Sequence, residues 1–516
     1  MKHKPTAEQE KAKRDVLGGD HTKLIAYAGA SKTTSLIYIS ESLKGEVGKY
    51  LAFNRNIAKQ AGTQFPKWVS CQTTHSLAFH AVGKAYVNAG RTIPDKNNRR
   101  LRTYEVASIL GVKDGYRGET AKISRNGITY MAMQTVVRFC YSADMEIDWH
   151  HVPYNRQWDT WSESERAEVR ALIIHYAKLA WTDIMDYDGK LSYEHDYYLK
   201  QYQLRHPTIK VDFLMIDEGQ DTNPAVLDIF TRQGEHAQLV MVGDQYQQIY
   251  AWRGAVDALD MFETPNVAYL TKSFRFGEAV AFEANKWLTL LDAPHPLVGF
   301  EKIASERVPV LDVPRAVLCR TNAQVIAETL HYQDEGRKVY VQGGTGDIKA
   351  FAEAAQSLMM GQPVEHAELI GFDNWDEVVA YAAEDEGAKD LRIFVKLVAE
   401  YGVEKILDIA RTAVTKEEYS DVVTSTAHKA KGREWDSVRI APDFAPPEPD
   451  DTGQVSLNTA EMKLAYVAVT RAQLKLECEA LNWVDDWVAA KASAEFPPLT
   501  TKVTDDGVEI TKEAVS

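Results

Sequence analysis

The chain of 516 residues contains few cysteines and no long apolar run. Its four cysteines form no C-x-x-C pair, so we expect neither a disulfide framework nor a cysteine zinc site. No apolar run approaches the roughly 18 residues that a membrane-spanning helix needs. The first residues lack the apolar stretch of a secretory signal. These absences predict a cytoplasmic or nuclear protein that does not contact a membrane.

The composition is that of a globular protein. Hydrophobic residues make up 45% of the chain and charged residues 26%, a balance that excludes wholesale disorder. At about 150 residues per domain, the length predicts three to four domains.

The net charge of −15 argues, on its face, against a nucleic-acid partner. The charge is unevenly distributed, however. Residues 1–100 hold 17 basic and 7 acidic residues, a net charge of +10. Residues 361–421 carry a net charge of −9, and residues 485–516 a net charge of −4. This asymmetry is compatible with one part of the chain facing a polyanion, and also with solvated faces of different sign.

Short apolar runs alternate with helical patterns along much of the chain. The runs predict strands at 24–28, 50–53, 68–71, 213–216 and 239–242, and the patterns predict helices over 32–43 and 56–65. Such alternation with short loops indicates a parallel sheet with helices on both faces. Residues 86–205 have helical spacing, including a helix over 163–185, and indicate an insertion. A second α/β pattern begins near 316–319 and returns at 438–440, with an acidic helical segment, 346–420, between them.

A phosphate-binding loop is predicted where the first strand meets the first long helix, at Ala26-Tyr27-Ala28-Gly29-Ala30-Ser31-Lys32-Thr33. Backbone N–H groups and the dipole at a helix N-terminus favour an anion. Lys32 could reach the β- and γ-phosphates of a nucleotide, and Thr33 could hold Mg²⁺. The strict pattern G-x-x-x-x-G-K-[ST] fails at Ala26 and Ser31, so an ordinary turn with a surface lysine stays open as an alternative.

Two adjacent acids, Asp217 and Glu218, follow the apolar run 213–216. In a nucleoside triphosphatase, Asp217 would hold Mg²⁺ and Glu218 would orient and deprotonate the attacking water. A pair of surface acids is the alternative for this motif alone. Two such motifs in the correct order, each at a strand end, favour the triphosphatase.

A third cluster follows the run 239–242. The side-chain amides of its glutamines, among them Gln247, could sense a γ-phosphate. Two aromatic residues, Tyr250 and Trp252, stand next to a cation, Arg253. This arrangement suits single-stranded nucleic acid, where base–aromatic stacking is worth roughly 1–3 kcal/mol per base. Core packing is the alternative.

Neither His150-His151 nor the pair His75 and His80 comes with a convincing set of metal ligands, so we interpret these as structural histidines.

Taken together, these motifs resemble those of superfamily 1 helicases of the UvrD/Rep group, with the closest likeness to the helicase region of F-box DNA helicases. The resemblance extends from about residue 5 to 480. Further matching segments are Gln9, residues 51–61 (motif Ia), 73–78 (Ib), 195–200, 270–275 (IV), 425–435 (V) and 464–472 (VI).

The resemblance implies an α/β fold with two RecA-like parallel-sheet domains of the P-loop NTPase type and helical insertions. The implied domains are 1A (1–85 and 206–275), 1B (86–205), 2A (276–345 and 421–485), 2B (346–420) and a tail (486–516).

The resemblance also implies the site residues, with ATP and Mg²⁺ as cofactors. Catalysis would involve Lys32, Asp217, Glu218, Gln247, Arg275 and Arg471. Nucleotide binding would involve Gln9, Gly29, Ala30, Ser31, Lys32, Thr33, Thr34, Phe274, Gly432 and Glu434, and the metal would be held by Thr33 and Asp217. DNA binding would involve Phe53, Asn54, Thr74, His75, Tyr250, Trp252, Arg253, Thr426 and His428.

The implied activity is an ATP-dependent helicase that moves 3′-to-5′ on single-stranded DNA and unwinds tailed duplexes or remodels recombination intermediates, in DNA repair or recombination. A recombinase or single-strand-binding protein is a further expected partner, and a monomer is the expected state. Ser31 stands where the family usually has glycine, and its Cβ resists any positive-φ conformation needed there. Two alternatives stay open: a translocase that strips proteins from single strands, and a nucleotide-gated DNA-binding module with impaired hydrolysis.

Overall fold

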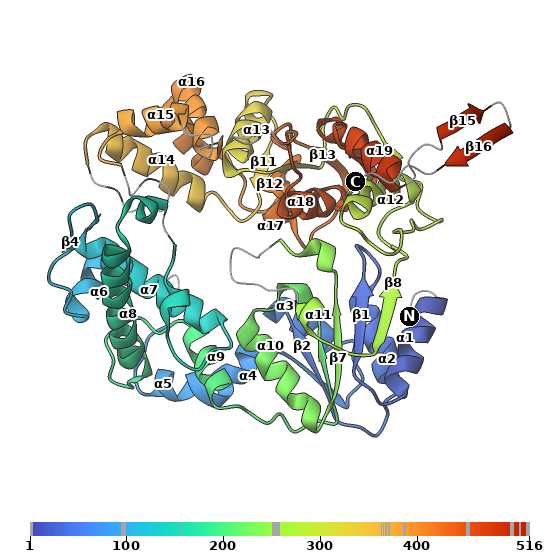
Figure 1. Ribbon diagram of the computed structural model, residues 1–516, viewed down its shortest axis with the longest axis horizontal. Helices are drawn as coiled ribbons and strands as arrows, with labels where there is room; N and C mark the ends of the chain where they lie inside the picture. Colours follow the sequence, from blue (N-terminus) through green and yellow to red (C-terminus); the bar gives the residue numbers. More distant parts are fainter. Residues whose placement is uncertain are drawn as a thin grey trace. The chain divides into compact units, whose positions relative to one another are not determined.

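The computed structural model describes residues 4–93, 100–154, 156–249, 258–362, 364, 366, 369, 372–384, 389–449, 455–495, 500–504 and 507–511. Contacts divide the chain into two compact units, whose elements are labelled in Figure 1. The first unit consists of Met1–Ala26 and Ser31–Leu270, and the second of Tyr27–Ala30 and Thr271–Ser516. None of the helices among the described residues combines the length and apolarity that crossing a membrane requires.

The first unit contains a six-stranded parallel sheet in the order β3-β2-β6-β7-β1-β8. Its strands are β1 (Thr22–Ala26), β2 (Gly48–Ala52), β3 (Val69–Thr73), β6 (Phe213–Ile216), β7 (Gln238–Gly243) and β8 (Asn266–Leu270). Every residue of β6 is buried, as expected for a parallel sheet covered on both faces. The predicted strands are confirmed, with bounds that differ from the predicted ones by up to two residues at either end, as in β1.

Among the described residues, the helices that accompany this sheet are α1 (Ala7–Leu17), α2 (Lys32–Glu41), α3 (Arg55–Ala61), α4 (Thr74–Ala78), α10 (Pro224–Thr231) and α11 (Ala258–Met261). Short 3₁₀ turns follow β6 at Gly219–Asp221 and β7 at Gln245–Gln247. Because the strands are parallel, the carboxyl ends of β1, β6 and β7 lie at one edge of the sheet. The two turns and the start of α2 therefore meet at that edge, where open α/β sheets bind ligands.

The segment between α4 and β6 is mostly helical, as predicted. It contains the π-helix η1 (Phe79–Gly83), α5 (Lys84–Asn88), α6 (Thr103–Ile109), the β4–β5 pair (Tyr116–Arg117 and Lys122–Ile123), α7 (Arg125–Tyr141), the 3₁₀ turns η2 (Trp149–His151) and η3 (Arg156–Thr160), α8 (Glu163–Met185) and α9 (His195–Leu204). The helix α8 has the predicted bounds. It begins with a capping box in which Ser162 and Glu165 satisfy each other's backbone N–H groups.

The second unit also contains a six-stranded parallel sheet, in the order β11-β12-β10-β13-β14-β9. Its strands are β9 (Glu306–Arg307), β10 (Ala316–Cys319), β11 (Val339–Val341), β12 (Val422–Thr426), β13 (Trp435–Ile440) and β14 (Ala472–Glu477). Its helices are α12 (Glu278–Leu290), α13 (Asn322–Asp334), α14 (Gly346–Met359), α15 (Trp375–Glu384), α16 (Lys389–Thr412), α17 (Ala427–Ala430), α18 (Thr459–Val469) and α19 (Val484–Glu495). The two parallel sheets confirm the α/β fold class.

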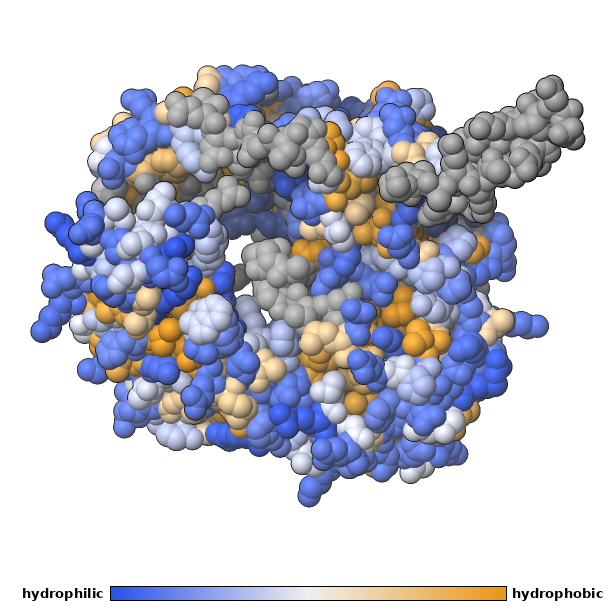
Figure 2. Space-filling view, viewed as in Figure 1, coloured by the Kyte–Doolittle hydropathy of each residue, from blue (hydrophilic) through white to orange (hydrophobic). Residues whose placement is uncertain are grey.

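The acidic segment 346–420 forms the helices α14, α15 and α16, as predicted, and these gather together in Figure 1 (orange). Their buried side chains share one hydrophobic core with α13 and with strands of the second sheet. The segment predicted as a tail, 486–516, contains most of α19 and an antiparallel pair, β15 (Thr500–Thr504) and β16 (Gly507–Thr511). On the face that Figure 2 shows, hydrophilic residues cover most of the described surface.

Candidate functional site

The loop between β1 and α2 adopts an unusual backbone conformation. Gly29 has a φ of 74°, which glycine adopts without steric cost. Ser31 has a φ of 59° and a ψ of 45°, the left-handed region, at the N-cap position of α2. Its side chain makes no capping hydrogen bond that would offset this strain. Since strained non-glycine residues are concentrated at functional sites, this geometry supports a ligand-binding role for the loop.

Two side chains from the start of α2 meet the two acids at the end of β6. The Lys32 Nζ lies 2.6 Å from the Glu218 Oε2, and the Thr33 hydroxyl donates to the Asp217 Oδ2 at 2.9 Å. The Tyr50 hydroxyl, from β2, donates to the same Asp217 oxygen at 2.8 Å. The structure thus brings together, in the first unit, the lysine, threonine and two acids that the sequence predicted.

The electrostatics of this cluster explain how a lysine stays charged while its side chain is only 16% exposed. Burial alone would lower the pKa of Lys32. The carboxylates of Glu218, Asp217 and Asp244 together outweigh this effect and raise the pKa above its ordinary value. Burial raises the pKa of Asp217, and the negative charge of Glu218 raises it further. The site is therefore a buried group of acids that needs a cation, supplied here by Lys32.

A chain of hydrogen bonds connects Glu218 to the turn after β7. The Gln220 side-chain Nε2 donates to the Glu218 Oε2 at 2.6 Å, and the Gln220 side-chain Oε1 accepts from the Asp244 backbone N–H at 2.9 Å. The Gln247 amide donates to the Asp244 Oδ2 at 2.6 Å. Asp244 is fully buried, and burial raises its pKa to about 6. Gln247 thus contacts the acid cluster through Asp244. The backbone of Glu218 is strained, with a φ of 54°.

Gln9, which was predicted to bind the nucleotide, is buried beside α2. Its carbonyl oxygen accepts from the Thr6 backbone N–H at 3.0 Å, and its amide donates to the Ser35 hydroxyl at 2.8 Å. Both ends of the side chain are therefore engaged by the protein. Thr34 is half-buried in the first turn of α2, and Ala30 is buried in the loop before it.

Four predicted DNA-contact residues lie at the carboxyl ends of β2 and β3. Phe53 is an exposed aromatic side chain, at 52% exposure, and Asn54 caps α3 through the backbone N–H of Ile57. Thr74 is buried at the start of α4, and the half-buried His75 follows it. The remaining residues predicted on this unit, Tyr250, Trp252 and Arg253, lie outside the described residues.

A cavity of about 320 Å³ opens between these strand ends and α9. Phe53, Thr74, His75 and Asp217 contribute to its lining. The His75 Nε2 lies 3.1 Å from the Asp196 carboxylate, which also accepts from the Tyr141 hydroxyl at 3.1 Å. The helical insertion therefore fixes the histidine that the sequence assigned to DNA binding.

In the second unit, Arg275 and Glu434 form an ion pair, with 2.6 Å between Nε and Oε2. The Arg275 guanidinium also donates to the Thr470 carbonyl at 3.1 Å, and the Gln473 amide donates to Glu434 at 2.9 Å. Arg275, predicted as a catalytic residue, is thus held by Glu434, which was predicted to bind the nucleotide.

Arg471 is almost completely buried, at 1% exposure. Its guanidinium donates to the Val467 and Arg433 carbonyl oxygens and to the Thr470 hydroxyl. The ring of Phe274 is half-buried, 5.2 Å from the ring of Phe300 between centroids. The other predicted residues of this unit lie around α17: Thr426 caps it, His428 is within it, and Gly432 follows with a φ of 80°.

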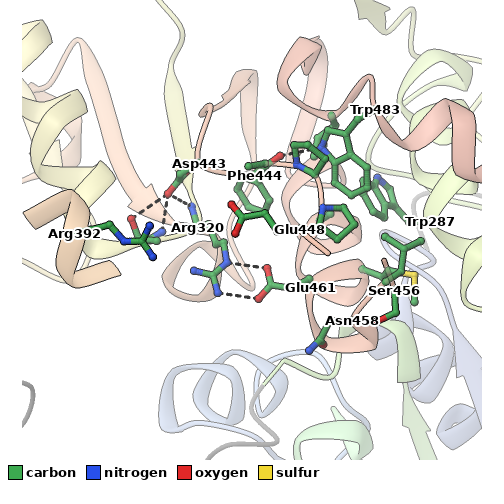
Figure 3. A pocket seen from close by; sticks show the side chains of 18 residues that line it. Trp287, Arg320, Arg392, Asp443, Phe444, Glu448, Ser456, Asn458, Glu461 and Trp483 are labelled. Atoms are coloured by element: carbon green, nitrogen blue, oxygen red, sulfur yellow. Dashed lines mark hydrogen bonds and ion pairs between the residues drawn. The ribbon is translucent and has the colours of Figure 1, made fainter. Parts of the chain in front are cut away.

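The second unit also contains a cavity of about 580 Å³ at the carboxyl ends of the neighbouring strands β10 and β13. Figure 3 shows aromatic and charged side chains around it. The apolar part of the lining includes Trp287, Phe444, Pro446, Pro447, Met462 and Trp483. Arg320 pairs with both Glu461 carboxylate oxygens, at 2.8 and 3.0 Å, and its backbone N–H donates to Asp443 at 2.9 Å.

Sequence reasoning missed several residues of these sites. Tyr50 and Gln220 contact the predicted acids, and Asp244 connects them to Gln247. Asp244 follows an apolar strand directly, which is the same signal that identified Asp217. Arg320 likewise follows the apolar run 316–319. No sequence signal identifies Tyr50, because a tyrosine within a buried strand is typical of a hydrophobic core.

Comparisons with known proteins show which families the sequence matches. Residues 6–262 match the model of the UvrD/REP helicase N-terminal domain, and residues 373–480 match the UvrD-like helicase C-terminal domain. The chain is 29% identical over 498 residues to F-box DNA helicase 1 of Gallus gallus, covering 88% of this chain and 47% of that protein. It is 28% identical over 500 residues to F-box DNA helicase protein 1 of Schizosaccharomyces pombe, covering 89% of this chain and 55% of that protein.

A shorter match joins 19% of the chain, at 30% identity over 106 residues, to 15% of the ATP-dependent DNA helicase Rep of Salmonella typhimurium. The chain spans about half the length of the two F-box helicases, because the matches cover 47% and 55% of those proteins.

Proposed function

The chain belongs to the UvrD/Rep helicase family, and from this we propose that it is an ATP-dependent DNA helicase. The observation that carries the proposal is the paired contact of Lys32 with Glu218 and of Thr33 with Asp217 at one edge of a parallel sheet. We further propose 3′-to-5′ movement on single-stranded DNA, with unwinding of tailed duplexes or remodelling of recombination intermediates. The direction rests on the family resemblance alone.

In the proposed reaction, the first unit binds the triphosphate. Lys32 exchanges its contact with Glu218 for the β- and γ-phosphates, and Glu218 then becomes available to accept a proton from water. The Thr33 hydroxyl and the Asp217 carboxylate place two oxygen atoms 2.9 Å apart, a donor set that fits Mg²⁺. Bound Mg²⁺ would neutralise charge on the phosphates.

From the family resemblance we propose that Arg275 and Arg471 stabilise the charge that develops on the γ-phosphate. An arginine in this role is typically worth about 10³–10⁵ in rate. Arg471 is held rigidly by three acceptors, which favours a fixed direction of its guanidinium. Arg275 is bound by Glu434, so a ribose that engages Glu434 would weaken this ion pair and free Arg275 for phosphate. Ribose binding and arginine release would then be coupled.

We propose that the strand-end cavities of both units contact single-stranded DNA. The exposed ring of Phe53 suits base stacking, worth roughly 1–3 kcal/mol, and His75 is positioned beside it by Asp196. In the second unit, Arg320 lies among the aromatic and proline side chains of the larger cavity (Figure 3). A DNA phosphate would compete there with Glu461 for the guanidinium.

ATP hydrolysis measured with and without single-stranded DNA tests the proposal. The wild-type protein should show DNA-stimulated hydrolysis, and Lys32→Ala should abolish it. Lys44→Ala is the matched control, because Lys44 is an exposed lysine beyond the other end of α2. The proposal fails if the wild type shows no stimulation or if Lys32→Ala hydrolyses ATP normally.

One observation favours a second candidate, a nucleotide-gated DNA-binding module with slow hydrolysis. Ser31 adopts a left-handed conformation where the family usually has glycine, so closing the loop on phosphate meets a strained residue. Such a protein would bind ATP and change its DNA affinity without appreciable turnover. Nucleotide-dependent DNA binding with no hydrolysis, restored to hydrolysis in Ser31→Gly, would identify this candidate.

A further inference from the structure

Three side chains with metal-binding atoms converge after the end of α7, away from the acid cluster at Asp217. The Asp144 Oδ2 lies 2.8 Å from the His150 Nε2 and 3.0 Å from the His151 Nε2. One ligand atom from each residue lies within 4.8 Å of the other two. From sequence alone the histidine pair lacks a third ligand, and the fold supplies it six residues upstream.

The opposite nitrogens of both imidazole rings face Asp148. The His151 Nδ1 accepts from the Asp148 backbone N–H at 3.0 Å and lies 3.2 Å from the Asp148 carbonyl oxygen, and the His150 Nδ1 is 4.0 Å from the Asp148 carboxylate. Histidines that bind metals usually donate their other N–H to a carbonyl or carboxylate, which fixes the ring. Asp148 is therefore positioned to orient both histidines while their Nε2 atoms point toward Asp144.

The surrounding structure holds this arrangement in place. The Lys200 Nζ donates to the Ser142 and Asp144 carbonyl oxygens, at 2.9 and 2.5 Å, and so ties the loop to α9. His151 is 2% exposed and packs edge-on against Phe139, with 5.4 Å between ring centroids. The ligand atoms are thus pre-positioned rather than carried on a free loop, which is what tight metal binding needs.

We propose that Asp144, His150 and His151 bind one divalent transition-metal ion of the zinc type. Two imidazole nitrogens and one carboxylate oxygen suit Zn²⁺, whereas Mg²⁺ and Ca²⁺ prefer sites made of oxygen. Tetrahedral ligands at about 2.0–2.1 Å from Zn²⁺ lie roughly 3.3–3.4 Å apart. The observed 2.8 and 3.0 Å would therefore increase by a few tenths of an ångström. A water molecule or the Ser142 hydroxyl, 3.1 Å from the His151 Nε2, would be the fourth ligand.

Metal binding requires the neutral imidazole and the ionised carboxylate. Bound metal would take up the Nε2 atoms of His150 and His151 and one carboxylate oxygen of Asp144. The ion would then fix the segment that presents Trp149, an exposed aromatic residue.

Equilibrium dialysis of the untagged full chain against Zn²⁺, in excess Mg²⁺, tests the site, with the visible absorption of bound Co²⁺ as a second readout. Wild type should bind one tightly held Zn²⁺ per chain and show tetrahedral Co²⁺ bands. His150→Ala and Asp144→Asn should weaken binding at least tenfold; both side chains are exposed, so these variants should fold. His175→Ala, which removes an exposed histidine on α8, is the matched control and should bind as wild type does.

Zn²⁺ should also raise the thermal midpoint of wild type and of His175→Ala, but not of His150→Ala. Equal Zn²⁺ affinity in wild type and His150→Ala would overturn the proposal, as would the absence of stoichiometric binding in wild type. Glu218→Gln should retain the ion, so the metal site and the proposed helicase activity can fail independently.

Discussion

The conformation of Ser31 leads to a quantitative prediction. Its φ of 59° and ψ of 45° place a side chain with a Cβ in the left-handed region, and its hydroxyl makes no capping bond. A non-glycine residue there costs about 1–2 kcal/mol. Glycine removes this strain, but the greater freedom of the unfolded chain offsets roughly 0.5–1 kcal/mol of the gain. Ser31→Gly should therefore raise the free energy of unfolding by about 0.5–1 kcal/mol.

Thermal and denaturant unfolding of the nucleotide-free protein measure this effect. For a unit of this size the midpoint should rise by about 1–4 °C. Ser31→Ala is the matched control, because it removes the hydroxyl but retains the Cβ and the strain. It should unfold like the wild type, within about 0.5 kcal/mol. If Ser31→Gly is no more stable than Ser31→Ala, the strain argument is refuted. Ser31→Gly should also hydrolyse ATP at least as fast as the wild type.

Three further predictions follow from the two units. Glu218→Gln should retain ATP binding and lower hydrolysis by about 10²–10⁴-fold, measured by nucleotide titration and steady-state rates, and a smaller loss would exclude Glu218 as the base. In the folded protein the pKa of Asp244 is raised from 3.8 to about 6, so the folded state binds this proton more tightly than the unfolded state does. The free energy of unfolding should therefore fall by about 2–3 kcal/mol as the pH rises from about 4 through 6. Asp244→Asn should lack this decline in denaturant titrations, and identical pH profiles would contradict the assignment. Arg320→Ala should weaken the binding of single-stranded DNA severalfold and lower the salt dependence of that binding. Glu461→Gln should strengthen binding, because it frees Arg320. If both variants change the affinity in the same direction, DNA phosphate does not compete with Glu461 for Arg320.

Much of the fold could be predicted from the sequence because its signals are local. Buried parallel strands appear as short apolar runs, and the helix over 163–185 has a clear pattern and capping residues. Lys32 and Thr33 could be predicted because they open the helix that follows an apolar run and a short loop, and Asp217 and Glu218 because they directly follow an apolar run.

The remainder of the site depends on contacts between distant segments. Tyr50 reaches Asp217 only because β2 pairs with β6, and strand order is not written in any local pattern. The αL conformation of Glu218 and the ion pair between Arg275 and Glu434 likewise depend on tertiary structure. Asp144, the third ligand of the proposed metal site, carries no signal in the sequence, because it is a lone aspartate on a loop.

The measurement that tests the central claim most directly is ATP-dependent unwinding of duplexes that carry either a 3′ or a 5′ single-stranded tail. Wild type and Glu218→Gln should be compared at several protein concentrations. We expect the wild type to unwind the 3′-tailed duplex, to leave the 5′-tailed duplex largely paired, and to do neither without ATP. Glu218→Gln should bind both substrates and unwind neither. Equal unwinding of both tails would contradict the proposed direction, and unwinding by Glu218→Gln at the wild-type rate would contradict the proposed site.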